Sequence, residues 1–242
     1  MRMMSRHSLR IAAMALMVIT LAGCGRTEIY KYKLTLAVNT PNGVKRGSSV
    51  AEVEFYEVSI PARGTMHKLR GEALYLDLGP GARPLIALLT SQLHPKPERI
   101  ESWTRDAGPE TRLMCRLYGI APSIHYQDDI PRLAQMYGPR QLAPTDLPDL
   151  VTFADINDPK SVIEVNPGDL QTLGPDITWN EITLESTDEP LTTGIVQKLP
   201  WIPAYFEKNL RLDGAPDHSK RNLANTLSSF DFNQTDDLRR SH

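Results

Sequence analysis

The feature that most constrains the fold is a run of alternating side chains that begins at residue 30. Apolar side chains occupy every second position of this run: Tyr30, Tyr32, Leu34, Leu36 and Val38. Most of the positions between them carry polar groups. A period of two places alternate side chains on opposite faces of an extended chain. The run therefore predicts a strand with one buried face.

Further strands are expected soon after this one. The turn signal Thr40-Pro41-Asn42-Gly43 precedes a second strand over residues 49–60, whose apolar phase changes at Phe55-Tyr56 as a β-bulge would require. A third strand is expected over residues 73–78 and a fourth over residues 85–89. The polar residues 61–70, which include His67, are expected to form a loop. This part of the chain predicts an antiparallel meander.

The second half is less regular. Residues 91–109 predict a long loop around Trp103, residues 128–137 a short helix, and three later stretches predict strands: 150–153, 161–165 and 177–185. Residues 111–118 fit either a strand or a helical turn. Nineteen prolines favour turns and short elements. The predicted fold class is therefore α+β and β-rich, with few short helices.

Prolines and polarity also suggest how the chain is divided. Pro144 and Pro148 mark a boundary between a β-rich domain, residues 30–143, and a second β-containing subdomain, residues 144–212. Two prolines interrupt the apolar residues 199–206, so we expect a strap across the surface rather than a helix. Residues 213–242 are polar and are predicted to be a disordered tail.

The first residues have the pattern of an export signal. Arg2, Arg6 and Arg10 precede an apolar run over residues 11–21 that only Thr20 interrupts. This run is shorter than the eighteen or so residues that span a bilayer as a helix. We therefore expect residues 1–23 to be a cleaved signal peptide.

The run ends in Leu21-Ala22-Gly23-Cys24, which resembles the lipobox of bacterial lipoproteins. The resemblance implies that Cys24 becomes the first residue of the mature chain, carries diacylglycerol on sulfur and is acylated on its amino group. Residues 24–29 would then be a lipidated tether. Gly25, in place of an aspartate, implies an outer-membrane anchor that faces the periplasm, with the inner membrane as the alternative. The chain thus resembles small envelope lipoproteins of Gram-negative bacteria, and the resemblance, limited to the first 25 residues, implies no activity.

Charge and cysteine content narrow the function classes. Removal of residues 1–23, with three arginines and no acids, changes the formal charge from −2 to −5 and leaves 219 residues. A mildly acidic chain argues against nucleic-acid binding. With Cys24 lipidated, Cys115 has no partner for an intrachain disulfide, and its apolar neighbours favour a buried, inert thiol over a nucleophile.

Catalytic and metal-binding signatures are weak. Asp155, Asn157 and Asp158 fail the EF-hand spacing and favour an Asx turn, the histidines lack ligand spacing, and no nucleophile motif is found. No cofactor or metal is therefore expected. We expect a non-enzymatic binding or structural module whose partner contacts come from four aromatic residues: Trp103, Trp201, Tyr205 and Phe206. Two alternatives stay open: a small-ligand carrier, or an envelope hydrolase with a site drawn from His94, His125, Asp128 and Asp129.

Overall fold

This computed structural model describes residues 27–57, 65–91, 93, 103–104, 108–109, 111–124 and 128–236. The chain divides into two units, residues 1–27 with 56–66 and residues 28–55 with 67–242. The first unit includes few described residues, namely the first residue of one strand, the last two of a second and the first two of a third. The account below therefore concerns the second unit.

The larger sheet has five strands in the order β3-β2-β1-β11-β8. Its strands are β1 Thr27–Thr40, β2 Gly43–Glu57, β3 Thr65–Arg70, β8 Arg140–Gln141 and β11 Thr178–Ser186. The alternation predicted for β1 is confirmed, because its apolar side chains from Tyr30 to Val38 are all buried. β1 begins at Thr27, so residues 27–29 belong to the sheet and not to a tether.

The prediction of a loop over residues 61–70 is wrong from Thr65 onward, where β3 begins. The sequence of β3 contains few large apolar residues, and of these Leu69 is buried in the core. Its polar neighbours Lys68 and Arg70 lie on the other face, where carboxylates pair with both. Ion pairs on the outer face thus take the place of the apolar alternation by which strands are usually recognised.

The smaller sheet has four strands in the order β10-β9-β5-β4. These are β4 Leu74–Leu76, β5 Leu85–Ala87, β9 Leu150–Phe153 and β10 Val162–Glu164, and a separate pair is formed by β6 Trp103–Thr104 and β7 Gly108–Pro109. In the centre of the sheet Ile86 faces Val151 in an antiparallel pair. This pairing joins the two halves of the chain, so residues 144–212 do not form a subdomain with a sheet of their own.

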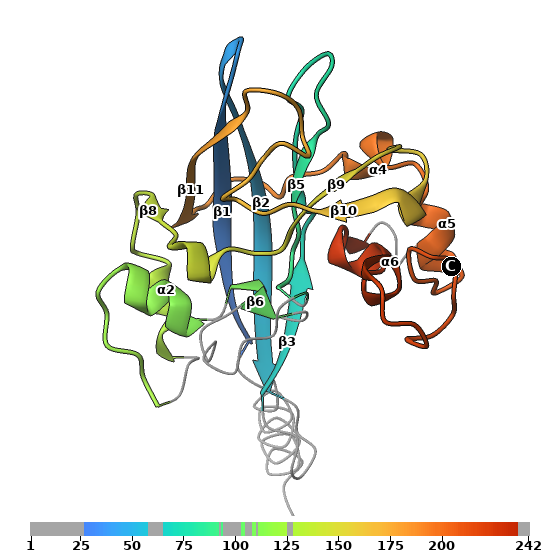
Figure 1. The fold of residues 1–242 in the computed structure, drawn as a ribbon. Helices are drawn as coiled ribbons and strands as arrows, with labels where there is room; N and C mark the ends of the chain where they lie inside the picture. The colour runs from blue at the N-terminus through green and yellow to red at the C-terminus, as the bar shows by residue number, and fades with distance from the viewer. Residues whose placement is uncertain are drawn as a thin grey trace, which may run out of the picture. The chain divides into compact units, whose positions relative to one another are not determined.

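Two apolar cores lie on opposite faces of the smaller sheet. One contains Leu85 and Leu150 together with the inner face of the larger sheet. The other contains Ile86 and Val151 together with C-terminal residues. Figure 1 shows the resulting order of layers, with the larger sheet, the smaller sheet and the C-terminal helices side by side. Burial on both faces explains why residues 85–89 are continuously apolar.

The helices are short, as the prolines suggest. They are α2 Thr111–Leu117, α3 Ile130–Leu133, α4 Ile195–Lys198, α5 Ile202–Glu207 and α6 Leu223–Thr226, with 3-10 turns at Pro144–Asp146, Pro159–Ser161 and Ser229–Asp231. Among the described residues, none of the helices has the length and apolar composition needed to span a bilayer.

Two expectations for the C-terminal third are wrong. Residues 202–207 form helix α5, because Pro203 lies in its first turn, where a missing N–H leaves no hydrogen bond unmade. Residues 213–236 are ordered rather than a disordered tail, since Leu227 and Phe232 are fully buried in the second core. Buried aromatic residues can fix a segment whose average composition is polar.

Candidate functional site

Trp201 lies at the base of an aromatic cluster on the C-terminal layer. Its ring is buried and makes edge contacts with Phe232, at 5.3 Å between centroids, and with Tyr205, at 5.7 Å. Its indole N–H donates to the carbonyl of Ile156 at 3.2 Å. A ring held on three sides in this way supports the surface above it rather than forming that surface.

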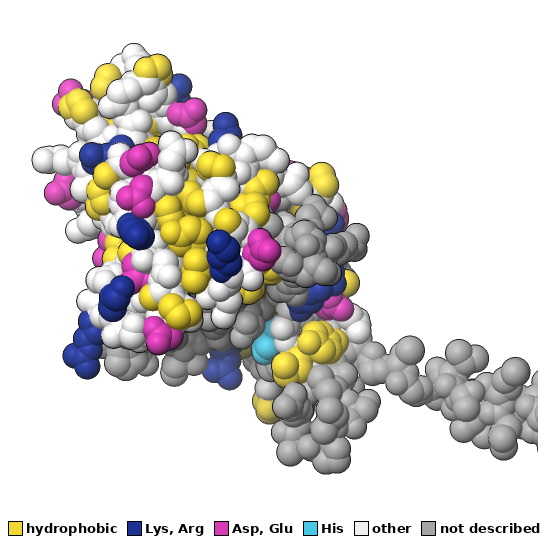
Figure 2. All heavy atoms as spheres, turned by 90° about the vertical axis from the view of Figure 1, so that its right-hand side faces the viewer, with side chains coloured by type: hydrophobic (Ala, Val, Ile, Leu, Met, Phe, Trp, Pro, Cys, Tyr) yellow, Lys and Arg dark blue, Asp and Glu magenta, His cyan; other side chains and the backbone are white. Residues whose placement is uncertain are grey.

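Tyr205 and Phe206, on α5, are half-buried and form the outer part of the cluster. Phe206 packs against the half-buried Phe230, with ring centroids 4.9 Å apart. Figure 2 shows hydrophobic side chains gathered on the face that carries the C-terminal helices. We call Tyr205, Phe206 and Phe230 the α5 surface. Half-exposed aromatic rings on rigid supports are the usual anchors of protein interfaces.

Acidic groups adjoin this surface. Burial raises the pKa of the Tyr205 hydroxyl, and the nearby carboxylates of Asp158 and Asp213 raise it further. The hydroxyl is therefore protonated near neutral pH and available as a hydrogen-bond donor. Asp213 is itself paired with Lys220 at 2.8 Å, so the feature that this surface offers a partner is its exposed aromatic area.

Trp103 lies in the first core, away from any surface that a partner can reach. Its ring is 2% exposed and stands edge-on to Tyr32, with centroids 5.7 Å apart. Its indole N–H donates to the carbonyl of Asp146 at 2.8 Å. Trp103 therefore contributes to packing, and its predicted role in binding does not agree with this location.

A small cavity of about 10 Å³, roughly the space of one water molecule, lies between the two sheets beside Trp103. Ser49, Glu72 and the ring of Tyr32 line it together with aliphatic side chains. The buried Tyr32 hydroxyl makes no hydrogen bond within the described residues, and burial raises its pKa. Pockets for organic ligands usually measure about 300–1,000 Å³. This cavity is therefore a poor fit for a small-ligand carrier.

The residues proposed for a hydrolase are only partly described. His94 and His125 lie outside the described residues, and so does Cys24. The Asp129 carboxylate is fully buried, accepts the backbone N–H of Ser123 and pairs with Arg132 at 3.0 Å. Asp129 thus has the structural role of holding the loop before α3. In the part of the chain that the structure describes, no group of three acidic, histidine or cysteine side chains could hold a metal ion.

Two smaller expectations are confirmed. The Asp155 carboxylate accepts the backbone N–H of Asn157 at 2.9 Å, which is an Asx turn between β9 and β10. Cys115 is fully buried in α2.

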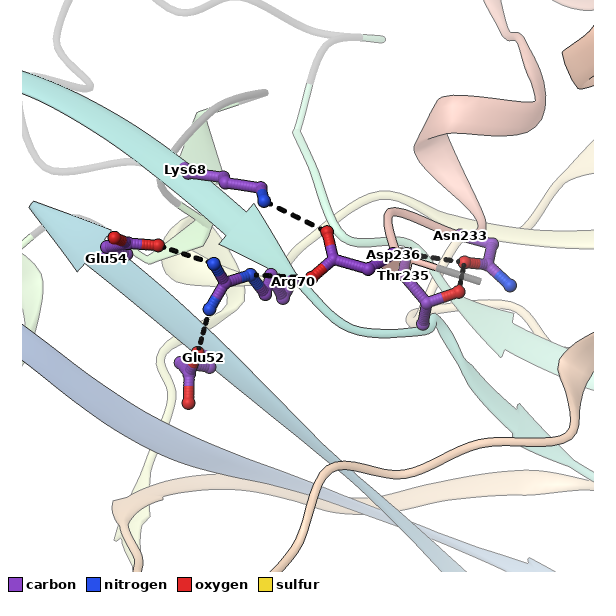
Figure 3. Close-up of polar contacts among 7 residues, drawn as sticks. All are labelled: Glu52, Glu54, Lys68, Arg70, Asn233, Thr235 and Asp236. Carbon is purple, nitrogen blue, oxygen red and sulfur yellow. Dashed lines mark hydrogen bonds and ion pairs between the residues drawn. The ribbon is translucent and has the colours of Figure 1, made fainter. Parts of the chain in front are cut away.

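Sequence reasoning missed a polar network that fastens the C-terminal residues to the larger sheet (Figure 3). Arg70 pairs with Glu52 at 2.8 Å, with Glu54 at 2.6 Å and with Asp236 at 3.3 Å, and Lys68 also reaches Asp236. Burial on its own would lower the pKa of Arg70, but the three carboxylates raise it. One sequence signal for ordered structure in the C-terminal residues was available. Ser228 and Asp231 have the spacing of a capping box, and in the structure they form that box.

Comparison with known proteins identifies no similar protein. No family model, no curated protein and no solved structure matches the chain.

Proposed function

We propose that this protein is a lipid-anchored envelope module that binds another protein and has no enzymatic role. The observation that carries the proposal is the α5 surface, where Tyr205 packs edge-on against the buried Trp201 and the neighbouring Phe206 packs against Phe230. The anchor itself is supported by the sequence Leu21-Ala22-Gly23-Cys24 and the basic and apolar residues before it. Under this proposal the lipid fixes the module at the membrane and the α5 surface selects the partner.

The test is site-specific photocrosslinking in the cells that produce the protein. A photoreactive phenylalanine analogue placed at Phe206 is expected to yield one dominant crosslinked protein, identified by mass spectrometry. Replacement of Cys24 by alanine in the same chain should reduce that product at least tenfold, because the anchor no longer concentrates the module near its partner.

The matched control places the same analogue at Val44, an exposed apolar residue of β2 that lies outside the α5 surface. Only background crosslinking is expected there. The same protein captured equally at both positions, or no protein captured at Phe206, would show that the α5 surface does not bind a partner.

A further inference from the structure

The hydroxyl of Tyr32 is an unusual polar group of the first core. The Tyr32 side chain is 2% exposed, and within the described residues its hydroxyl makes no hydrogen bond. Burial raises the pKa of this hydroxyl, so it keeps its proton at neutral pH and can donate it. Folded proteins seldom leave such a group unsatisfied, because a hydroxyl that leaves water loses hydrogen bonds that the interior must replace.

A second tyrosine of the same strand shows the usual arrangement. Tyr30 is also 2% exposed, and its hydroxyl donates to the carbonyl of Pro109 at 2.6 Å. The rings of Tyr30 and Tyr32 lie on the buried face of β1, with their centroids 6.3 Å apart. The two side chains thus differ in one respect. The hydroxyl of Tyr30 is bonded directly to the protein, whereas that of Tyr32 is bonded to none of the described residues.

Tyr32 lines the small cavity between the two sheets, together with Ser49 and Glu72. The cavity measures about 10 Å³, close to the space that one water molecule needs. Its lining combines polar side chains with aliphatic ones, whereas cavities that stay empty are lined by apolar groups. The size and the lining of the cavity therefore favour a single water molecule as its occupant.

The other polar side chains that line the cavity have partners in the protein. The Ser49 hydroxyl donates to the carbonyl of Glu72 at 2.6 Å. The Glu72 carboxylate accepts the N–H of Ile195 and the side-chain amide of Asn233. Both groups can accept more, because a hydroxyl oxygen has two lone pairs and a carboxylate about four. A water in the cavity thus has acceptors for its protons as well as the Tyr32 hydroxyl as a donor.

We propose that this cavity binds one water molecule, which accepts a hydrogen bond from the Tyr32 hydroxyl and donates to Ser49 or Glu72. Such a water is part of the fold. It connects the middle of β1 with Glu72, the residue that also holds α4 and the C-terminal segment. The water site is independent of the lipid anchor and of the α5 surface.

Oxygen-17 magnetic relaxation dispersion of the full chain tests the site, because it counts the waters that stay in a protein for longer than the protein takes to rotate. Tyr32→Phe should lower this count by one, since the ring keeps its place and only the group that binds the water is removed. The same variant should also lower the urea concentration at the midpoint of unfolding, because a hydrogen bond is lost.

Tyr30→Phe is the matched control. It removes the same atom from the same face of β1, but this hydroxyl is bonded directly to Pro109. Tyr30→Phe should lower the midpoint of unfolding and leave the count of waters unchanged.

Three results would overturn the water site. The first is an unchanged count in Tyr32→Phe, and the second is an equal fall in both variants, which would place the lost water elsewhere. The third is a higher midpoint of unfolding in Tyr32→Phe, because removal of a hydroxyl stabilises a protein only where that hydroxyl is buried without a hydrogen bond.

Discussion

At the scale of single residues, a few buried polar side chains fasten distant parts of the chain to one another. The carboxylate of Glu72 is 4% exposed and accepts the N–H of Ile195 at 2.8 Å and the side-chain amide of Asn233 at 3.1 Å. Charge-assisted bonds of this kind are about twice as strong as neutral ones. One glutamate thus connects the start of the smaller sheet with α4 and with the C-terminal residues.

Asp213 makes the stability of this region depend on pH. Its pKa is lowered from 3.8 to about 2, mainly because Lys220 donates to it at 2.8 Å and also because the N–H of Ala215 does. Between these values the unfolded carboxyl is protonated while the folded one is ionised, so folding releases a proton and stability rises with pH. We therefore expect the free energy of unfolding to fall as the pH is lowered from about 4 to 2.

The measurement is urea unfolding at several pH values. Asp213→Asn should show a smaller loss over this window, and Lys220→Met an intermediate one, because the remaining N–H donors still favour the carboxylate. Equal slopes for the wild type and Asp213→Asn would contradict the assignment.

At the scale of elements, the sequence predicts the strands whose apolar side chains are buried in a core. The alternation in β1 and the apolar runs of β5 and β9 predict their strands because these faces lie in the cores. β3 gives no such signal, because Arg70 and Lys68 gain their stability from carboxylates on β2 and on the C-terminal segment. These ion pairs join residues that are far apart in the sequence. The spacing of residues along the chain therefore does not predict them.

The candidate site was likewise predicted in part from the sequence. The aromatic residues 201, 205 and 206 are evident in the sequence, and the structure brings them together with Phe230. Trp103 is equally prominent in the sequence, but its ring lies in the core. Composition identifies a residue able to anchor a partner, whereas only packing determines which side of it faces solvent.

The contact between β2 and the end of β3 depends on the absence of one side chain. A Cβ on Gly71 would lie 2.5 Å from the Cβ of Ala51, far inside van der Waals contact. We expect Gly71→Ala to destabilise the protein by about 2 kcal/mol, the cost of overpacking a core. Thermal or urea unfolding measures this loss.

Ala51→Gly provides the matched variant, since it removes the atom that the new methyl group meets. In the double variant the two losses should not add, and the coupling energy should be about 1 kcal/mol or more. Strict additivity would show that the strain lies elsewhere.

At the scale of the whole molecule, the C-terminal residues complete both layers that they contact. Phe232 fills the second core, the N–H of Leu89 donates to the carbonyl of Asp231, and Asp236 pairs with Arg70. A deletion of residues 228–242 removes all three contacts. Loss of one buried phenylalanine already costs about 3–5 kcal/mol, which is much of the stability of a typical domain.

We therefore expect the chain that ends at residue 227 to lose its cooperative melting transition and its resistance to protease. The control is a chain that ends at residue 236, which keeps every contact described here and should melt cooperatively. A protease-resistant, cooperatively melting chain of residues 24–227 would contradict this role.

The pairing of β1 with β11 has a consequence for how the protein is made. Ser186 follows its partner Tyr32 by about 150 residues, and chains are synthesised at about 5–20 residues per second. The first strand therefore waits roughly ten to thirty seconds for its neighbour, with one edge open and its tyrosines and leucines uncovered. During that interval the open edge and the apolar face of β1 can associate with other chains, so delayed pairing is a period of exposure to misassembly.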